Sequence, residues 1–357
     1  MRLGIIGLPY VGKTTVFNAL TRSQAKTGGF GASGNQPNLA VVRVPDERID
    51  RLAEMYKPKK ITYATVEYLD IAGFEQGASR SKESEQFISH ARKVDALIHV
   101  VRAFEDPNVL SVGETVNPKR DFNILESELI LTDLVQVETR LERIAETIRR
   151  GKKPDNPNEQ GALERCKEAL EAEKPLRELE FSPEEFGAIK SFAFLTLKPE
   201  LVVVNIGEDQ IGQDESAYQD IAPGKPVVVV CGKLEAELSQ LDEAEAKDLM
   251  QEYGIEESSL NRMIKVSYDL LGLISFLTAG EDEVRAWTIR KGTSAHEAAG
   301  EIHSDIQRGF IRAETIAYDD LMSCGSMAKA KEKALLRLEG KEYTMKDGDI
   351  VNFRFNV

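Results

Sequence analysis

Cysteine is scarce in this sequence, and long apolar runs are missing from it. Cys166, Cys231 and Cys324 lie far apart with no C-x-x-C pair, so neither a disulfide framework nor a zinc site is indicated, and a reducing compartment fits. The longest apolar stretch, near residues 270–279, is about half the length that a membrane-spanning helix needs. The first residues run straight into a predicted strand and lack the apolar region of a signal peptide. We therefore expect a cytoplasmic protein with no membrane partner.

Positive charge is outnumbered as well. The chain has 46 lysines and arginines against 60 aspartates and glutamates, which gives a net charge of −14. This balance excludes a protein that coats nucleic acid through a uniformly basic surface, although a local basic patch remains open. With 357 residues, of which 41% are hydrophobic, the chain is long enough for two or three domains with cores of their own.

Short β-branched runs alternate with helical patterns along much of the chain. Several of these runs are continuously apolar, which is typical of parallel strands that are buried on both faces. Strands and helices in alternation predict a doubly wound α/β domain. The runs predicted to be strands are residues 3–6, 65–69, 96–101, 201–204 and 227–230.

A helical segment interrupts this alternation. Apolar residues within 130–148 recur at steps of four and three, which is the spacing of a coiled-coil seam. The pattern ends in a basic turn, residues 149–153, and a second helical pattern follows it. We interpret residues 122–195 as an inserted antiparallel helical hairpin, which is either a structural arm or a partner-binding arm.

The last part of the chain, from about residue 280, mixes strands and helices differently. Its pattern predicts a strand at 284–289, a helix at 294–307 that begins at a serine N-cap, and a strand at 311–318. Residues 343–355 carry a predicted turn at Asp347, Gly348 and Asp349. This segment is expected to form a small α+β domain.

Residues 7–14 read Gly-Leu-Pro-Tyr-Val-Gly-Lys-Thr and fit the pattern G-x-x-x-x-G-K-[ST]. They stand directly after a predicted strand and before a helical pattern, which is the context that a phosphate-binding loop requires. Its glycines let successive backbone N–H groups point at phosphate oxygens, and the helix N-terminus reinforces them. Lys13 would neutralise the β- and γ-phosphates, and the Thr14 hydroxyl would ligate Mg²⁺.

The second half of such a site is an acidic residue at the end of a neighbouring strand. Asp70 closes the strand predicted at 65–69, and Gly73 follows three residues later. Asp70 would hold Mg²⁺ through water, and the Gly73 N–H would sense the γ-phosphate. Together with the phosphate-binding loop, this D-x-x-G pattern is the signature of a switch-type nucleoside triphosphatase.

Two groups that such enzymes use for hydrolysis are missing. Phe74 stands where Ras-like enzymes have the glutamine that orients the attacking water. His90, on the helix predicted after it, is a candidate catalytic residue, with Arg80 and Lys82 as alternatives that the sequence does not separate. The switch threonine is also missing from the glycine-rich stretch 28–35.

Residues 205–208, Asn-Ile-Gly-Glu, follow a predicted strand at the place where GTPases carry N-K-x-D. The lysine that covers the guanine ring is absent, and the acid is Glu208, one methylene longer than aspartate. A lost bidentate contact removes on the order of 1–3 kcal/mol of discrimination, by analogy with base readout elsewhere. Strict guanine specificity is therefore not expected.

Together these motifs resemble the YchF/Obg-like ATPase family. The closing segment, from residue 285 through the turn at 347–349 to the C-terminus, resembles that family's TGS domain, so the resemblance covers nearly the whole chain. The matching segments before it are residues 7–15 with 17–21, 37–38, 44–46, 70–73 with 77–79, 99–104 and 205–208.

The resemblance implies an α/β P-loop NTPase of the Ras-like G-domain type, with an inserted α-helical hairpin and a C-terminal α+β, ubiquitin-like TGS domain. It implies a monomer with ATP as substrate and Mg²⁺ as cofactor that associates with the ribosome or ribosomal RNA. The expected domains are residues 1–121 with 196–279 for the nucleotide-binding domain, 122–195 for the insertion and 280–357 for the TGS domain. In the family Asn205 and Ile206 would contact adenine. The residues predicted to bind nucleotide are Pro9, Tyr10, Val11, Gly12, Lys13, Thr14, Thr15, Gly73, Asn205, Ile206 and Glu208, and those predicted to bind the metal are Thr14 and Asp70.

The sequence departs from the family in both switch segments. Residues 34–38 read G-N-Q-P-N in place of T-I-E-P-N, and residues 81–86 take the place of a G-x-G-L-G-N segment. The leading hypothesis is a slow Mg²⁺-dependent ATPase that acts as a conformational switch, with the basic turn 149–153 and the TGS domain as its RNA-facing parts. The alternatives are a GTPase of the Obg-like class and a nucleotide-sensing ribosome- or RNA-binding protein that hydrolyses nothing.

Overall fold

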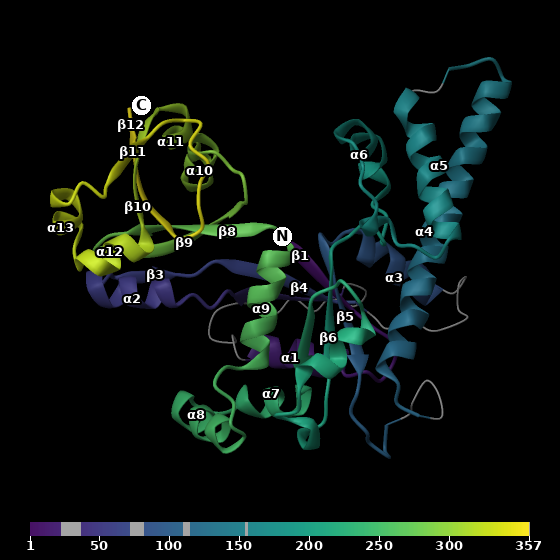
Figure 1. The fold of residues 1–357 in the computed structure, drawn as a ribbon, viewed down its shortest axis with the longest axis horizontal. Coiled ribbons are helices and arrows are strands. Elements are labelled where there is room, and N and C mark those ends of the chain that lie inside the picture. Colours follow the sequence, from purple (N-terminus) through teal and green to yellow (C-terminus); the bar gives the residue numbers. More distant parts are fainter. Residues whose placement is uncertain (23–36, 72–81, 110–114, 154–155, 357) are drawn as a thin grey trace. The chain divides into compact units, whose positions relative to one another are not determined.

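The computed structural model describes residues 1–22, 37–71, 82–109, 115–153 and 156–356 (Figure 1). They belong to two compact units. The first comprises residues 1–41 and 67–263, and the second comprises residues 42–66 and 264–357. None of the helices in the described ranges combines the length and the apolar character needed to cross a membrane.

A six-stranded sheet in the order β2-β4-β1-β5-β6-β7 lies at the centre of the first unit. β1 is parallel to β4 and β5, β5 to β6, and β6 to β7. The strands are β1 Arg2–Ile6, β2 Asn38–Arg43, β4 Thr65–Asp70, β5 Ala96–Arg102, β6 Glu200–Asn205 and β7 Val227–Val230. The five strands predicted from the sequence are therefore confirmed. Because these strands are parallel, their carboxyl ends meet at one edge of the sheet, where α/β folds bind ligands.

Helices follow the strands as the sequence pattern predicts. Every residue of β5 and β6 is buried, as expected for central strands that are covered on both faces. The apolar face of α1 packs on the sheet through Val16, Phe17, Ala19 and Leu20, all of which are buried. Outside the insertion, the α-helices of the first unit are α1 Lys13–Arg22, α3 Lys82–Arg92, α7 Gly232–Leu238, α8 Glu243–Glu252 and α9 Ser259–Leu270. The chain passes into the second unit within α9.

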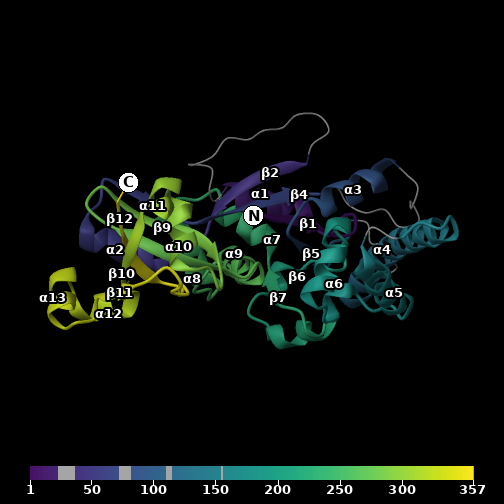
Figure 2. The same cartoon turned by 90° about the horizontal axis from the view of Figure 1, so that it is seen from above.

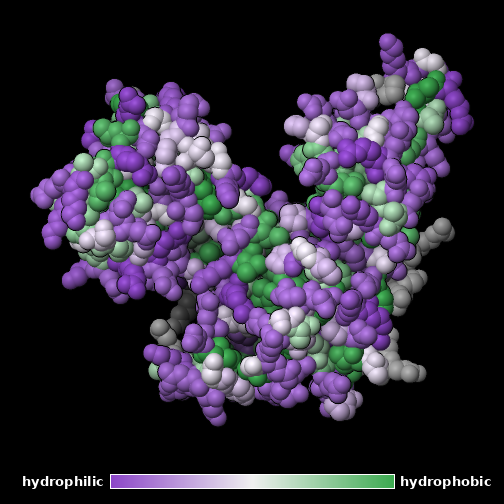
Figure 3. Space-filling view, viewed as in Figure 1, coloured by the Kyte–Doolittle hydropathy of each residue, from purple (hydrophilic) through white to green (hydrophobic). Residues whose placement is uncertain are grey.

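The helical insertion is a hairpin of α4 Pro118–Arg149 and α5 Pro157–Glu171, with α6 Pro183–Ile189 beside it (Figure 1). The predicted seam is confirmed: Ile130, Val137 and Ile144 of α4 are buried in one cluster with Leu163 and Cys166 of α5. Hydrophobic residues show among polar ones over this pair in the space-filling view (Figure 3). α4 is 32 residues long, or about 48 Å.

A buried carboxylate attaches the hairpin to the chain that enters β6. Asp133 of α4 is fully buried and accepts hydrogen bonds from the backbone N–H groups of Leu195, at 3.0 Å, and Thr196, at 2.7 Å. The Thr196 hydroxyl donates a third bond to it at 2.7 Å. Since β6 begins at Glu200, Asp133 marks the point where α4 passes the amino edge of the sheet.

The second unit is built on a mixed six-stranded sheet in the order β11-β10-β12-β8-β9-β3. β8 and β9 form an antiparallel hairpin, β12 is parallel to β8, and β10 is antiparallel to β12 and β11. The helix α10 packs into the hydrophobic cluster on one face, so the α+β expectation is confirmed. The strands are β3 Lys60–Thr62, β8 Leu273–Ala279, β9 Glu283–Arg290, β10 Phe310–Ala317, β11 Arg337–Glu339 and β12 Asp349–Phe355.

This sheet extends beyond the segment predicted for it. β8 lies upstream of the predicted boundary at residue 280, and β3 pairs in parallel with β9 although it lies far upstream in the chain. α2 Glu47–Tyr56 belongs to the same unit, where Arg48 forms an ion pair with Asp347 at 2.7 Å. Residues 42–66 thus complete a sheet whose other strands all follow residue 272.

Two expectations for the C-terminal segment are wrong in detail. The helix predicted at 294–307 is broken at His303, which has extended backbone angles and whose Nδ1 accepts a hydrogen bond from the Asp305 N–H at 3.1 Å. The strand predicted to reach Tyr318 ends one residue earlier, because Tyr318 begins the next helix. The helices of this segment are α10 Ala295–Ile302, α11 Ser304–Arg308, α12 Tyr318–Cys324 and α13 Met327–Glu332.

Candidate nucleotide-binding site

The phosphate-binding loop joins the end of β1 to the start of α1. Gly7 and Gly12 have φ angles of 153° and 91°, which favour glycine. A Cβ at Gly7 would also lie 2.5 Å from the carbonyl oxygen of Val100 on β5. Tyr10 has φ 64° and is 59% exposed, so this strained residue stands at the outside of the loop. The backbone is thus held in the curled form that presents N–H groups to an anion.

Lys13 lies beneath this loop and is only 8% exposed. Its ammonium group donates hydrogen bonds to the carbonyl oxygens of Gly7, at 3.0 Å, and Leu8, at 2.9 Å. Burial lowers the pKa of Lys13 to about 8, although the charge of Asp70 opposes that shift. A phosphate group bound in the loop would therefore complete the surroundings of this buried cation.

Thr14 and Asp70 come together at the carboxyl edge of the sheet. The Thr14 hydroxyl donates to a carboxylate oxygen of Asp70 at 3.4 Å. Burial raises the pKa of Asp70, while Lys13 and the Thr14 bond pull it down. A hydroxyl and a carboxylate fit Mg²⁺, which takes oxygen ligands and is commonly held by one or two protein groups plus phosphate.

Asn205, at the end of β6, connects two loops of the site. Its amide NH₂ group donates to the Val11 carbonyl at 3.0 Å, and its amide oxygen accepts from the Gly232 N–H at 3.0 Å. A Cβ on Gly12 would lie 2.2 Å from the Asn205 amide nitrogen, so the loop requires glycine there. Both functional ends of the Asn205 amide are therefore engaged within the protein.

The turn after Asn205, which the sequence predicts to be the base side of the site, lies beside the start of α7. Ile206 is buried, and the Gly207 N–H donates to the Gln210 side chain at 2.8 Å. Glu208 begins a short 3₁₀ turn and forms an ion pair with Lys233 of α7. The carboxylate that stands where guanine readers have their aspartate is thus already paired with a cation.

Three residues at or near this site were not predicted from the sequence: Gly232, Lys233 and Arg102. Gly232 and Lys233 belong to no motif considered from the sequence, and only the tertiary structure brings them to Asn205 and Glu208. Arg102, at the end of β5, is buried and donates through Nε to the Phe104 carbonyl at 3.0 Å, which shapes the next loop. The only sequence signal for Arg102 was its place within residues 99–104, one of the segments that resemble the family.

The remaining predicted residues are placed as follows. Pro9 lies within the loop, and Thr15 is exposed on α1 beside Thr14. Gly73 lies outside the described residues, as do Phe74 and Arg80, and Lys82 is the first residue of α3. The structure therefore unites the phosphate, metal and base residues of the prediction, whereas the switch segment stays a prediction.

His90 is not brought to the phosphate-binding loop. It lies in the last turn of α3, about 12 Å along the helix from Lys82. Asp95, five residues later, accepts a hydrogen bond from the Arg2 N–H at the beginning of β1, which is the opposite edge of the sheet from Gly7. Burial lowers the pKa of His90, with a smaller contribution from Lys93. Its position favours a structural role.

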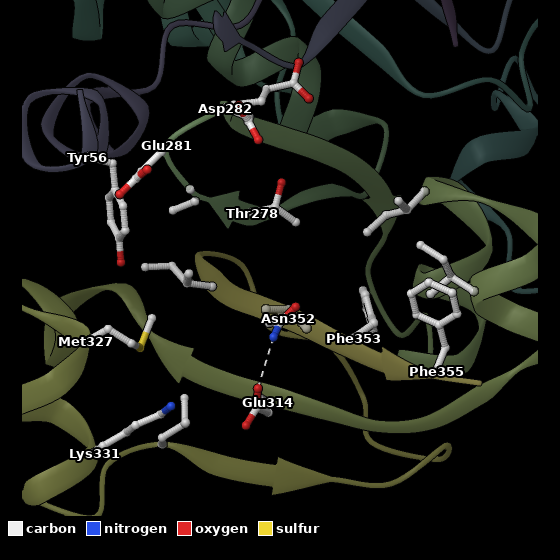
Figure 4. Close-up of a pocket in the computed structure, with 18 residues that line it drawn as sticks. Tyr56, Thr278, Glu281, Asp282, Glu314, Met327, Lys331, Asn352, Phe353 and Phe355 are labelled. Atoms are coloured by element: carbon white, nitrogen blue, oxygen red, sulfur yellow. Dashed lines mark hydrogen bonds between the residues drawn. The ribbon is translucent and has the colours of Figure 1, made fainter. Parts of the chain in front are cut away.

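A separate cavity of about 670 Å³ lies within the second unit (Figure 4). Asn352 and Glu314 come from adjacent strands, and the Asn352 amide donates to the Glu314 carboxylate at 3.0 Å. Lys331 lines the same cavity, and Glu314 also pairs with Arg354. The buried carboxylate here is already satisfied within the protein, so the phosphate-binding loop remains the candidate site.

Two family models match the chain. Residues 2–147 match MMR_HSR1, described as "50S ribosome-binding GTPase". Residues 273–356 match YchF-GTPase_C, described as a protein of unknown function. The second match begins at the first residue of β8, in agreement with the sheet of the second unit.

The chain is similar over its whole length to proteins named "Ribosome-binding ATPase YchF". It is 46% identical to that of Bacillus subtilis (strain 168), across 99% of each chain. It is 43% identical to that of Escherichia coli O157:H7, across 100% of this chain and 99% of the relative. Among solved structures it resembles the YchF GTPase of Schizosaccharomyces pombe, with a TM-score of 0.86 and 34% identity across 99% of this chain and 97% of that one.

Proposed function

The chain belongs to the YchF family, and from that membership we propose that it is an Mg²⁺-dependent ATPase of the cytoplasm that associates with the ribosome. The proposal rests on one observation: the residues predicted to bind phosphate and metal and the turn predicted to bind the base belong to one site. Lys13, Thr14 and Asp70 lie together where they would bind phosphate and metal. The base side beside it lacks the lysine of guanine readers and has its acid paired with Lys233.

The phosphates would bind where the loop N–H groups and the α1 N-terminus converge. Lys13 would exchange its bonds to the Gly7 and Leu8 carbonyls for phosphate oxygens, with which its positive charge is better matched. Thr14 and Asp70 would hold Mg²⁺, which neutralises charge on the β- and γ-phosphates. The chain would thereby position the triphosphate through groups that are already assembled around β1 and β4.

The base would lie against the turn at Ile206 and the start of α7. Because the Asn205 amide bonds to Val11 and Gly232, it would hold this platform in place rather than read the base by hydrogen bonds. The apolar Ile206 would contact either purine ring. Guanine would need the Glu208 carboxylate, which Lys233 occupies, so the geometry favours adenine.

Nucleotide binding tests the proposal directly. We expect calorimetry to show tighter binding of a non-hydrolysable ATP analogue than of the matching GTP analogue, and tighter binding with Mg²⁺ than without. Asp70→Asn should abolish the gain from Mg²⁺ and leave metal-free binding nearly unchanged, since it removes a metal ligand. Asp220→Asn, at an exposed position on the 3₁₀ segment Glu215–Ile221, is the matched control.

Each other outcome has a definite meaning. Preference for the GTP analogue would overturn the assignment of the base side and favour an Obg-like GTPase. Binding of neither analogue would overturn the site. If ATP binds but a single-turnover assay with ribosomes present shows no phosphate release, the protein is a nucleotide sensor that does not hydrolyse. The published names of the relatives differ in the same respect, ATPase for the bacterial proteins and GTPase for the yeast structure.

A further inference from the structure

α4 carries a second apolar stripe that the fold does not use. Its seam residues, such as Val137, are buried against α5. Leu131 and Val135 stand apart from that seam and are 53% and 62% exposed. They are four residues apart and therefore share one helix face. Large exposed apolar side chains side by side are a common mark of an interaction surface.

This stripe forms one wall of a groove between α3 and α4, with a volume of about 1,140 Å³. The two helices lie side by side in both views (Figures 1 and 2). Ile88 contributes apolar surface from α3, and Phe192 also lines the groove. All of these residues belong to the first unit. The groove is therefore bounded by two helices, each of which contributes apolar side chains to a lining that also contains polar and charged residues.

The charges at the two ends of the groove differ in sign. α3 connects two parallel strands, and α4 leaves the carboxyl end of β5 and passes the amino edge at Asp133, so both helices run in the same direction along the sheet. Glu85 of α3 and Glu128 of α4 are nearer the N-termini of the two helices and place negative charge at one end of the groove. The other end is lined by Arg92, Lys93, Arg140 and Arg143.

Part of this basic end lacks ion-pair partners among the residues that the structure describes. Arg140 is paired with Glu159 at 2.6 Å, and Arg92 donates to the Gln136 side chain. Lys93 and Arg143 are exposed and form no ion pair with any residue in the described ranges. The groove thus offers free cations beside an apolar wall.

We propose that this groove binds an amphipathic helix of a partner protein, with acidic side chains over the basic end. The span from Glu128 to Arg143 is about 22 Å, which matches about four turns of helix. Leu131 and Val135 meet the apolar face of that helix, as in other helix-in-groove complexes. Nucleic acid fits less well, because its phosphates gain nothing from an apolar wall and are repelled at the acidic end.

The test uses the full-length protein and two synthetic helices of about 16 residues, each held helical by a hydrocarbon staple. Both carry the same leucine stripe. One has a turn of glutamates, and the other has lysines in those positions. We expect fluorescence anisotropy to show the acidic peptide binding about tenfold or more tightly than the basic one, since the free cations favour it.

Variants locate the binding on α4. Leu131→Ser with Val135→Ser should weaken the acidic peptide about tenfold or more. Ile148→Ser is the control, because Ile148 is 46% exposed on the same helix but does not line the groove. Arg143→Glu should weaken the acidic peptide and strengthen the basic one, and Arg149→Glu should change neither.

Three results would overturn the proposal. The first is equal binding of the two peptides, and the second is displacement of the acidic peptide from the groove by an RNA hairpin. The third is a dimer of this chain, seen by sedimentation, that Leu131→Ser with Val135→Ser dissociates. Since Leu131 and Val135 are solvent-exposed, their replacement should leave the unfolding transition unchanged, and that measurement accompanies the binding data.

Discussion

Lys13 gives the site a pH dependence whose direction follows from its burial. Its pKa is lowered to about 8, so the free protein carries the ammonium below pH 8 and loses it above. A bound phosphate favours the charged form and therefore raises that pKa. We expect ATP-analogue affinity to be constant below about pH 7 and to fall by up to about tenfold per pH unit above pH 8. Calorimetry from pH 7 to 9.5 measures this slope.

Proton uptake provides the check on that assignment. At pH 9 most of the free protein has neutral Lys13, so binding should take up nearly one proton. Calorimetry in buffers of different ionisation enthalpy counts that proton. Lys13→Ala should bind more weakly and show a flat profile over the same range. A wild-type protein that takes up no proton at pH 9 would show that another group governs the affinity.

Lys233 is predicted to influence the choice of base. Its ion pair with Glu208 would compete with the N–H groups of guanine for that carboxylate. Lys233 is largely exposed, and ion pairs of that kind are weak, so removing the ammonium should raise GTP-analogue affinity relative to ATP by about twofold to fivefold. Competition calorimetry on Lys233→Ala measures the ratio.

The comparison for Lys233 is another exposed lysine of the first unit. Lys247, on α8, lines no part of the site and forms no ion pair within the described residues. Lys247→Ala should leave the ratio of the two affinities unchanged. If Lys233→Ala also leaves it unchanged while the wild-type protein still prefers ATP, then the base is selected elsewhere and the ATPase proposal stands without Lys233.

The connection between the phosphate-binding loop and α7 depends on one side chain. Asn205→Ala would leave the Val11 carbonyl and the Gly232 N–H unpaired in a buried position. An unpaired buried group costs about 1–3 kcal/mol, so the two groups together should lower the free energy of unfolding by about 2–6 kcal/mol. Urea denaturation measures that loss.

Asn205→Ala also distinguishes a supporting role of Asn205 from a direct contact between Asn205 and the base. Because Asn205 holds both sides of the site, Asn205→Ala should weaken ATP and GTP analogues by similar factors. Lys233→Ala, in contrast, should change their ratio. A selective loss of ATP affinity in Asn205→Ala would mean that Asn205 contacts adenine directly, as the resemblance to the family first implied.

Five of the six strands of the first sheet could be predicted because each carries its own signal, whereas β2, Asn38–Arg43, was not predicted. Val227–Val230 is a continuous apolar run, and the phosphate-binding loop has glycine, lysine and threonine at fixed spacing. β3 had no such signal, because it is three residues long and its pairing with β9 joins Lys60 to Glu283. Local patterns do not encode a partner that lies so far along the chain.

The candidate site likewise contains residues that the sequence predicts and residues that only the structure brings together. Lys13, Thr14 and Asp70 could be predicted because their chemistry fixes the spacing from the strands that hold them. The pairing of Glu208 with Lys233 joins residues 25 apart, at the ends of two strands that the sheet makes neighbours. The position of His90 could not be predicted for a related reason, because its proximity in sequence to the switch segment does not determine which end of α3 it occupies.

The net charge of the whole molecule confines the proposed ribosome association to a local surface. With a net charge of −14, the protein as a whole is repelled by RNA, so binding must come from a confined cationic surface. The end of α4 and the turn after it offer one: Arg149, Arg150, Lys152 and Lys153 are all exposed. The seam between α4 and α5 keeps these cations at the end of a long rigid pair of helices.

Reversal of these four charges to glutamate is predicted to abolish most co-sedimentation with ribosomes. The wild-type complex should weaken steeply with salt, because each neutralised phosphate releases a counterion, and the variant should retain little of that dependence. A control reverses Arg51, Lys247, Lys291 and Lys341, which are also exposed, and brings the net charge from −14 to the same −22. If both variants lose binding equally, overall charge is responsible and the turn has no special role. Loss in the first variant alone, with ATP-analogue binding intact, would place the contact on the hairpin and separate it from the nucleotide site.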